Sequence, residues 1–427
     1  MAAAKSEFQN ELKARGYVHQ VTDEAALDRL ARSETITGYI GFDCTAPSLH
    51  VGNLLGIMML RKLQQAGHRP VVLIGGGTGL IGDPSGKLGE RTLNPEHQVA
   101  EWADRLRAQV SRFVDFSGGA AVLADNYEWL AKLQMIPFLR DVGKHFSLGS
   151  MLAKESVRSR MGRTDEGISY TEFSYQILQA YDYLALLERH DCTLQLGGSD
   201  QWGNITAGVE LIRRMTGRPA FGLTMPLVTK ADGGKFGKTE SDTVWLDEKR
   251  TSPYEMYQFW LNTADEDVPA FLKYFTFLGR REIADLLGAM AETPEKREAQ
   301  RVLAREVTAL VHGEAKELEA EEISRAFFSG DVESLTELQL ADACRAMPTT
   351  SLRREELAQM RVADLLTRVG LADSKKRARE LLADGAIYLN GRKMEPQDAA
   401  VGPEGALFGR FIILRRGRRT YHAGVLE

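Results

Sequence analysis

The sequence of 427 residues is poor in cysteine and has no long apolar segment. Its three cysteines, Cys44, Cys192 and Cys344, are scattered and share no spacing typical of a metal site. We therefore expect no disulfide framework and a reducing compartment. No stretch approaches the roughly 18 uncharged apolar residues that a membrane helix requires, and residues 1–17 lack the apolar core of a signal peptide. These absences predict a cytoplasmic protein that does not enter a membrane.

Charge is unevenly distributed along the chain. The segment from Ser351 to Glu427 has 15 Lys and Arg against 10 Asp and Glu, whereas the 350 residues before it have 39 against 49. The net charge of −5 therefore combines an acidic body with a basic end. A basic end favours contact with a polyanion, and a chance imbalance is the less favoured alternative.

The first part of the chain alternates apolar strands with helices. Strands are expected at 36–42 (ITGYIGF), 69–77 (RPVVLIGGG), 120–126 (AAVLADN) and 192–198 (CTLQLGG). Helices are expected from Ser48, as a cap, to Ala66, around 171–189, and over about 203–214. This alternation predicts an α/β fold with a Rossmann-like, doubly wound parallel sheet. Ligands bind such sheets at the carboxyl ends of the strands, where glycines cluster at 75–77 and 197–198.

The rest of the chain predicts further parts. A lysine-containing loop is followed by a helical, charged region up to about residue 330, and residues 331–355 are less regular. After them, the sequence predicts a helix around 362–369, a second helix capped by Ser374, and a type I′ turn at Asn390–Gly391 between two strands. We therefore expect a Rossmann-like domain over 1–230, a helical domain over 231–330, a linker over 331–355 and a small α+β domain over 356–427.

The start of the first helix, PSLHVGNLLG (47–56), contains two glycines, Gly52 and Gly56. Each costs about 1 kcal/mol relative to alanine inside a helix. Polar side chains, His50 and Asn53, flank the first glycine. The local pattern alone leaves open why this helix start carries glycines and polar side chains.

The loop GGGTGLIGDPSGK (75–87) resembles two common phosphate-binding motifs but fits neither. Its glycines match G-x-G-x-x-G, yet turn-forming GDPSG follows where that motif requires a helix. Leu88 stands where a P-loop needs Ser or Thr. What remains is Asp83 near a strand end, with cations at Lys87 and Arg91. A structural turn is the alternative, but it would not need two cations beside an aspartate.

Two further clusters have ordinary and functional interpretations. Lys235 and Lys238 lie in the glycine-rich loop 229–241, which is a solvated turn or a mobile cover for a phosphate chain. Tyr175, Gln179 and Asp182 share one helix face, which is a polar surface or part of a binding site. Asp200 and Gln201 follow the strand at 192–198, at its carboxyl end.

Together these segments resemble class I aminoacyl-tRNA synthetases, and specifically the bacterial-type tyrosyl-tRNA synthetase family. HVGN (50–53) resembles the signature His-Ile-Gly-His, and KFGKT (235–239) resembles Lys-Met-Ser-Lys-Ser. YIGFDCTAPSLHVGN, GLIGDPSGK, FSYQILQAYD, QLGGSDQWGNITAG and KADGGKFGKTES resemble the tyrosine enzyme in order and spacing. The C-terminal segment resembles a small RNA-binding domain shared with a ribosomal protein. The resemblance covers essentially the whole chain, and five motifs in register are far more specific than any one.

The resemblance implies a tyrosine–tRNA ligase. Such an enzyme forms tyrosyl-adenylate and pyrophosphate from L-tyrosine and ATP, then transfers tyrosine to the 3′ end of tRNA(Tyr). It further implies a homodimer, Mg²⁺ arriving with ATP, no protein-bound metal, no DNA partner, and anticodon recognition by the helical region. The family uses no protein base in activation, so catalysis rests on positioning and charge stabilisation.

The resemblance also implies roles for individual residues. The phosphate-stabilising, catalytic group is Thr45, His50, Lys87, Arg91, Lys235 and Lys238. The tyrosine-binding group is Tyr39 and Asp182 at the phenol, Asp83, Tyr175 and Gln179 at the ammonium group, and Gln201 near the reacting groups. The ATP-binding group is Gly41, Asp43, His50, Gly52, Asn53, Asp200, Lys235 and Lys238.

Two residues depart from the family pattern. Asn53 replaces the second signature histidine, and Ile40 stands where some relatives have a cysteine that contacts ribose. Two alternatives remain open: the related tryptophan enzyme, which has no use for Asp182 or for this C-terminal segment, and a non-catalytic RNA-binding relative, against which His50 and the two loop lysines argue.

Overall fold

The computed structural model describes residues 2–85, 93–154, 157–158, 167–229, 231, 236–237, 243–394, 400–417 and 420–427. They form two compact units, one of Met1–Asp247 with Ala264–Leu287, the other of Glu248–Thr263 with Gly288–Glu427. Within these described ranges, no helix is both long enough and apolar enough to cross a bilayer.

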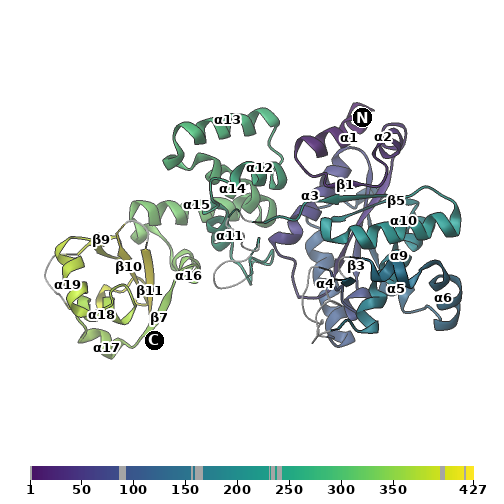
Figure 1. Cartoon of the computed structure of the whole chain (residues 1–427). Helices are drawn as coiled ribbons and strands as arrows, with labels where there is room; N and C mark the ends of the chain where they lie inside the picture. Colours follow the sequence, from purple (N-terminus) through teal and green to yellow (C-terminus); the bar gives the residue numbers. More distant parts are fainter. Residues whose placement is uncertain are drawn as a thin grey trace. The chain divides into compact units, whose positions relative to one another are not determined.

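The first unit is built on a six-stranded sheet (Figure 1). Its strands are β1 (Gln20–Val21), β2 (Thr37–Asp43), β3 (Arg69–Gly75), β4 (Val122–Asp125), β5 (Cys192–Gly198) and β6 (Phe221–Met225), in the order β1-β6-β5-β2-β3-β4. All neighbours are parallel except β1, which runs antiparallel to β6. The α/β fold with a parallel sheet is confirmed, as are the four expected strands, whereas β1 and β6 were not expected.

Helices cover this sheet and enclose its core. They are α1 (Ala2–Ala14), α2 (Glu24–Ser33), α3 (Val51–Gln65), α4 (Glu96–Val110), α5 (Tyr127–Leu130), α6 (Met135–Asp141), α7 (Leu148–Leu152), α9 (Tyr170–His190), α10 (Trp202–Thr216) and α12 (Val268–Phe275). Tyr39 of β2 packs in one core cluster with Tyr183 of α9 and Leu211 of α10. Ile40 and Phe42 instead face Gly56 of α3. Successive β2 side chains therefore point to opposite faces, as a strand requires.

The start of α3 differs from the expected one. Ser48 does not cap the helix, because its buried hydroxyl donates to the Leu49 carbonyl at 2.7 Å and accepts from Gln109 Nε2 at 2.8 Å. The cap is His50, whose Nδ1 accepts the Gly52 N–H at 3.0 Å. Asn53 Oδ1 accepts the His50 N–H at 3.1 Å and completes a capping box. The expectation for Ser48 was wrong because one local and one tertiary hydrogen bond already occupy its hydroxyl.

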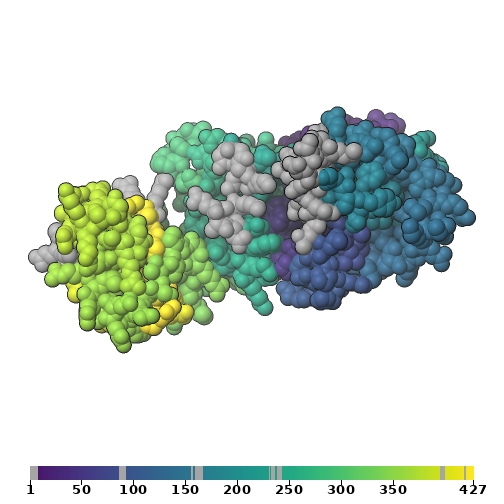
Figure 2. Space-filling model, turned by 60° about the horizontal axis from the view of Figure 1, so that its bottom comes forward, coloured from purple at the N-terminus to yellow at the C-terminus, as the bar shows by residue number. Residues whose placement is uncertain are grey.

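The second unit contains helices followed by a second, smaller sheet. Its helices are α11 (Pro253–Leu261), α14 (Glu298–His312), α15 (Glu314–Ser329), α16 (Glu337–Arg345), α17 (Arg354–Ala358), α18 (Val362–Arg368) and α19 (Lys375–Ala383). The last residues of α13 (Arg280–Glu292) also belong to it. Its strands are β7 (Thr349–Leu352), β8 (Ile387–Leu389), β9 (Arg392–Lys393), β10 (Phe411–Arg416) and β11 (Thr420–Leu426), in the order β7-β11-β10-β8-β9. Figure 2 shows the chain from α17 onward, in yellow-green, as a rounded mass.

The C-terminal elements agree with their sequence signals. Ser374 caps α19 by accepting the Arg377 N–H at 3.2 Å. Asn390 and Gly391 have φ of 48° and 83°, as a type I′ turn requires. The segment 331–355, expected to be irregular, contains α16 and β7, and β7 pairs in parallel with β11. A strand before residue 356 therefore completes the C-terminal sheet.

Candidate active site

The strands of the first sheet separate at one point along β2. The β2–β5 pairing extends to Tyr39 and Gln195, whereas the β2–β3 pairing continues to Asp43 and Gly75. The chain continues from β2 to β3 and β4 on one side and returns to β5 on the other. This is the topological switch point at which doubly wound sheets bind ligands. The predicted residues Gly41, Asp43 and Thr45 lie at this end of β2, and Gly41 and Thr45 are exposed.

The N-terminus of α3 supplies polar hydrogens beside this point. Because His50 Nδ1 accepts the Gly52 N–H, a neutral imidazole ring carries its proton on Nε2 and can donate there. The helix start also has partial positive charge, which suits a phosphate. A Cβ at Gly52 would lie 2.6 Å from His50 Cε1, so glycine is needed for this placement of the imidazole. The arrangement fits an anion beside the imidazole.

Gly237 of the glycine-rich loop 229–241 and the residues that follow this loop lie against the same helix start. Val51 N–H donates to the Val244 carbonyl at 3.0 Å, and His50 forms a backbone bridge with Trp245. A Cβ at Gly237 would lie 3.4 Å from the Gly52 nitrogen, so this part of the loop lies against α3. Four predicted cations lie outside the described residues, namely Lys87, Arg91, Lys235 and Lys238.

A buried carboxyl and a buried phenol meet on the other side of the switch point. Asp182 of α9 accepts hydrogen bonds from Asn126 Nδ2 at 2.9 Å and Trp129 Nε1 at 2.7 Å. Burial raises the pKa of Asp182 to about 8, against the opposing effect of these two donors. The Tyr39 hydroxyl is buried and has no hydrogen-bond partner among the described residues. Burial raises the Tyr39 pKa, and the nearby Asp182 raises it further.

A chain of hydrogen bonds connects this pair to the end of β2. Asn126 Nδ2 also donates to Thr78 Oγ1 at 2.8 Å, and its Oδ1 accepts the Gly77 N–H at 2.8 Å. Thr78 Oγ1 donates to Asp43 Oδ1 at 2.7 Å, and the Tyr175 hydroxyl donates to Asp43 Oδ2 at 2.8 Å. The predicted residues Asp43, Tyr175 and Asp182 are therefore parts of one network.

A second network joins three of the other predicted polar residues, Asp83, Gln179 and Gln201. Gln201 Nε2 donates to Asp83 Oδ2 at 2.7 Å. Asn204 Nδ2 donates to Gln179 Oε1 at 3.0 Å and to Gln201 Oε1 at 3.1 Å. Burial, with Asp83 nearby, raises the pKa of the adjacent Asp200. Residues from the loop after β3, from α9 and from the end of β5 are thus brought together.

Four residues of these networks were not predicted. Asn126 follows β4 directly and Thr78 lies three residues after β3, so their position at carboxyl ends is a signal that sequence reasoning could have used. Asn204 lies within the quoted motif QLGGSDQWGNITAG, whereas nothing in the local sequence distinguishes Trp129. In the part of the chain that the structure describes, no three His, Cys, Asp or Glu side chains lie close enough to hold a metal ion.

Comparison with known proteins places this geometry in a family. Residues 31–329 match the family model for class I tRNA synthetases (W and Y), and residues 339–423 match the tyrosine–tRNA ligase SYY-like C-terminal domain. The chain is 54% identical to the tyrosine–tRNA ligase of Bacillus caldotenax over 415 residues, 96% of this chain and 98% of that protein. It is 53% identical to tyrosine–tRNA ligase 2 of Enterococcus faecalis over 97% of this chain and 98% of that protein.

A solved structure agrees with these relatives. A C-terminally truncated mitochondrial tyrosyl-tRNA synthetase of Aspergillus nidulans matches with a TM-score of 0.68 and 30% identity, over 77% of this chain and 98% of that one. The first family model includes tryptophan and tyrosine enzymes, but the C-terminal model and the near full-length relatives are those of the tyrosine enzyme. The chain therefore belongs to the tyrosine–tRNA ligases, a family of class I aminoacyl-tRNA synthetases.

Proposed function

We propose that this chain activates L-tyrosine with ATP and then charges tRNA(Tyr). In the first step a tyrosine carboxylate oxygen attacks the α-phosphate of ATP in line, the bond to the β-phosphate breaks, and tyrosyl-adenylate and pyrophosphate form. In the second step the terminal ribose hydroxyl of the tRNA attacks the activated carbonyl, and AMP leaves. Since the attacking carboxylate is already ionised, the first step needs no protein base.

The single observation that carries this proposal is the Tyr39–Asp182 pair. A buried hydroxyl without a partner costs free energy unless a ligand satisfies it, and the Tyr39 hydroxyl lies near a carboxyl that Asn126 and Trp129 hold in place. A substrate phenol can donate to Asp182 and accept from Tyr39. Tyrosyl-tRNA synthetases are themselves the standard example of rejecting a substrate that lacks such a hydroxyl.

We assign the substrate ammonium group to Asp83, Tyr175 and Gln179, and the region of the reacting carboxylate to Gln201 and Asp43. Asp83 and Gln201 are already hydrogen-bonded to each other, as are Tyr175 and Asp43. Binding therefore meets side chains that are oriented in advance, which lowers the entropic cost of reaching the reactive geometry.

The phosphates of Mg–ATP are assigned to the N-terminus of α3. His50 Nε2 and Thr45 would donate to the departing pyrophosphate, and the cations Lys87, Arg91, Lys235 and Lys238 would stabilise its charge. Mg²⁺ enters as part of the substrate. The contact of Gly237 with the start of α3 supports the approach of the loop lysines to the same phosphates.

The nucleoside is assigned to the glycines and amides beside these phosphates. Gly41 and Gly52 leave room for adenine and ribose, and Asp200 lies on the β5 side. The capping box uses the oxygen of Asn53, so its amide nitrogen is the donor for ribose. Ile40 cannot supply the ribose contact that a cysteine makes in some relatives.

We further assign activation to residues 1–230, anticodon recognition to the helical part of 231–330, and additional tRNA binding to 356–427 beyond the connecting segment 331–355. We also assign the protein to the cytoplasm, as expected from its few cysteines and the absence of an apolar N-terminal segment.

Tyrosine-dependent exchange of pyrophosphate into ATP tests the function directly. Exchange should require tyrosine, and neither tryptophan nor phenylalanine should replace it at equal concentration. Exchange that proceeds equally well with tryptophan would support the tryptophan enzyme, and no exchange with any amino acid would support a non-catalytic relative.

The Tyr39–Asp182 pair should determine the specificity for tyrosine over phenylalanine. Asp182→Ala should abolish useful activation of tyrosine, because it removes the acceptor of the substrate phenol and leaves the buried Asn126 and Trp129 donors unpaired, at a cost of about 1–3 kcal/mol for each. Tyr39→Phe should lower tyrosine activation less than Asp182→Ala does. It should also lower the ratio of kcat/KM for tyrosine to kcat/KM for phenylalanine. Tyr17→Phe is a matched control, since Tyr17 is equally buried but donates to the Tyr274 carbonyl. An unchanged ratio in Tyr39→Phe would remove Tyr39 from the pocket.

The loop lysines should act on the transition state. Alanine at Lys235 or Lys238 should lower the rate of adenylate formation in a single turnover while the Kd for tyrosine stays the same. Lys132→Ala, at an exposed position, is the control. If tyrosine affinity fell and the rate did not change, the two lysines would belong to substrate binding instead.

We expect the basic face of α19 to bind tRNA and to have no effect on tyrosine activation. Lys376 and Arg379 are exposed on this helix. The double variant Lys376→Ala/Arg379→Ala should weaken tRNA binding and reduce the slope of log affinity against log salt by about 0.7–0.9 for each lost phosphate contact. The exchange rate should not change. Equal tRNA affinity and salt slope in the variant would exclude this helix as a phosphate contact.

We also propose that two copies of the chain associate through α6 and α7. Their side chains Met135, Ile136, Leu139, Leu148 and Leu152 are each at least 40% exposed, and exposed apolar patches mark protein interfaces. The resemblance to the family makes a second copy of this chain the expected partner for this surface.

Sedimentation of the wild type should give a dimer, and Ile136→Asp/Leu148→Asp should give a monomer. The control Leu338→Asp changes another exposed leucine and should leave the dimer intact; a dimer in both variants would place the interface elsewhere.

A further inference from the structure

One arginine of the first unit lies between an exposed carboxylate and a buried one. Arg107 is in the last turn of α4, and its side chain is 34% exposed. Its Nη1 donates to Asp104 Oδ1 at 2.5 Å, and its Nη2 donates to Asp125 Oδ2. Asp104 is exposed, whereas Asp125 is buried at the end of β4. An exposed ion pair contributes little, but a buried carboxylate needs a compensating charge, so we expect the pair with Asp125 to be the one that matters.

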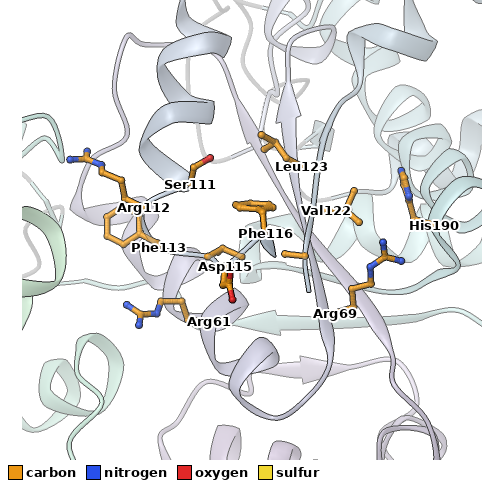
Figure 3. Close-up of a pocket in the computed structure, with 12 residues that line it drawn as sticks. Arg61, Arg69, Ser111, Arg112, Phe113, Asp115, Phe116, Val122, Leu123 and His190 are labelled. Atoms are coloured by element: carbon orange, nitrogen blue, oxygen red, sulfur yellow. The ribbon is translucent and has the colours of Figure 1, made fainter. Parts of the chain in front are cut away.

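The direction of α4 brings Arg107 to this carboxylate. Helix α4 connects the parallel strands β3 and β4, so it ends near their amino ends. There Ser111, Phe116 and Val122, the first residue of β4, line one surface depression (Figure 3). Side chains on a helix point toward its N-terminus. Arg107 therefore points back toward the carboxyl end of β4, where it meets Asp125.

Asp125 in turn faces the glycine loop that follows β3. Its Oδ1 accepts the Tyr127 N–H at 2.8 Å. A Cβ at Gly76 would lie 2.5 Å from Asp125 Oδ1 and 2.9 Å from its Oδ2, so the carboxylate lies directly against the backbone of this loop. The neighbouring Asn126 Oδ1 accepts the Gly77 N–H at 2.8 Å. Two consecutive residues at the end of β4 therefore contact two consecutive glycines of the loop.

The same loop orients the proposed tyrosine site. Its next residue, Thr78, donates to Asp43 Oδ1 at 2.7 Å and accepts from Asn126 Nδ2 at 2.8 Å. Asn126 Nδ2 also donates to Asp182 at 2.9 Å. A shift of the loop would therefore move the hydrogen-bond partners of both carboxylates that the proposed function places at the substrate. The connection from Arg107 to this site runs through Asp125.

The charge state of Asp125 depends in part on this arginine. Burial raises the pKa of Asp125, and the nearby Glu128 raises it further. Hydrogen bonds from the backbone amides of Tyr127 and Gly76 lower it, as does the positive charge of Arg107. Arg107 therefore favours the ionised carboxylate, in which both oxygens accept hydrogen bonds. Removing Arg107 would leave a buried carboxylate that takes up a proton more readily and holds the loop less firmly.

We propose that Arg107 is a positioning residue of the tyrosine site. By pairing with Asp125 it holds the loop after β3 against the end of β4. The held loop presents Thr78 and Asn126 to the carboxylates of the site. This inference rests on the proposed function, because it assumes that tyrosine binds at these carboxylates. Partners that are oriented in advance lower the entropic cost of binding, so loss of the pair should weaken the binding of tyrosine more than that of ATP.

Pyrophosphate exchange by the full chain tests this proposal through separate KM values for tyrosine and ATP. Arg107→Gln should raise the KM for tyrosine about tenfold, equivalent to ~1.4 kcal/mol, and should change kcat and the KM for ATP by less than about twofold. A merely structural role would lower the amount of folded enzyme, so the apparent kcat would fall and both KM values would stay the same. Arg107→Lys keeps the positive charge beside Asp125 and should have a KM for tyrosine closer to that of the wild type.

A matched control and a double-mutant cycle show whether Arg107 acts through Asp125. Arg105→Gln removes another arginine of α4, which donates to Glu101 at 2.6 Å, and should have the KM values of the wild type. Asp125→Asn keeps the shape of the side chain and should also raise the KM for tyrosine. The double variant Arg107→Gln/Asp125→Asn should have the same KM for tyrosine as Asp125→Asn alone, because two residues that act as one unit are not additive.

The results that would overturn this inference differ from those that would overturn the proposed function. An unchanged KM for tyrosine in Arg107→Gln, or additive effects in the double variant, would overturn the role of Arg107 while exchange by the wild type persists. Absence of tyrosine-dependent exchange in the wild type would overturn the proposed function and this inference with it.

Discussion

The separation of β2 from β5 after Tyr39 is the constraint on which the candidate active site depends. While two parallel strands stay paired, their backbone groups satisfy each other and leave no space for a ligand. Beyond Tyr39 and Gln195 this pairing ends, yet β2 continues beside β3 to Asp43. The end of β2 can then be reached by side chains from α9, from the loop after β3 and from the residues after β5. Every described residue of the proposed tyrosine site comes from one of these segments or from β2 itself.

Glycines at the strand ends allow this convergence. A Cβ at Gly75 would overlap Asp43, and one at Gly76 would lie 2.5 Å from Asp125 Oδ1. These glycines let the loop after β3 approach two carboxylates closely, so that Thr78 can hydrogen-bond Asp43 while Asn126 holds Thr78 and Asp182. The two glycines at the start of this loop therefore serve close packing of polar side chains.

Burying so many polar groups is unfavourable unless each has a partner. The two networks satisfy most of the polar atoms before any substrate arrives, and they orient the side chains in the process. The Tyr39 hydroxyl is the exception, because the described residues offer it no partner. In the function proposed above, a substrate phenol supplies this partner, so the free energy that burial of the hydroxyl costs is recovered on binding.

The sequence by itself determined the α/β class, four of the six strands of the first sheet, the helices α3, α9 and α10, and the family. The periodicities that predict strands and helices are local, and the family's motifs keep their order and spacing along the sequence. Both can therefore be recognised without the structure. Tertiary structure alone decided that His50 and not Ser48 caps α3, that β7 completes the C-terminal sheet, and that Asn126 and Trp129 hold Asp182. Each of these depends on residues distant in the sequence. Gln109 donates a hydrogen bond to the Ser48 hydroxyl, β11 pairs with β7, and Asn126 at the end of β4 donates to Asp182 of α9. The sequence thus indicated many of the polar side chains that gather at the candidate site, while long-range contacts decided which of their atoms meet.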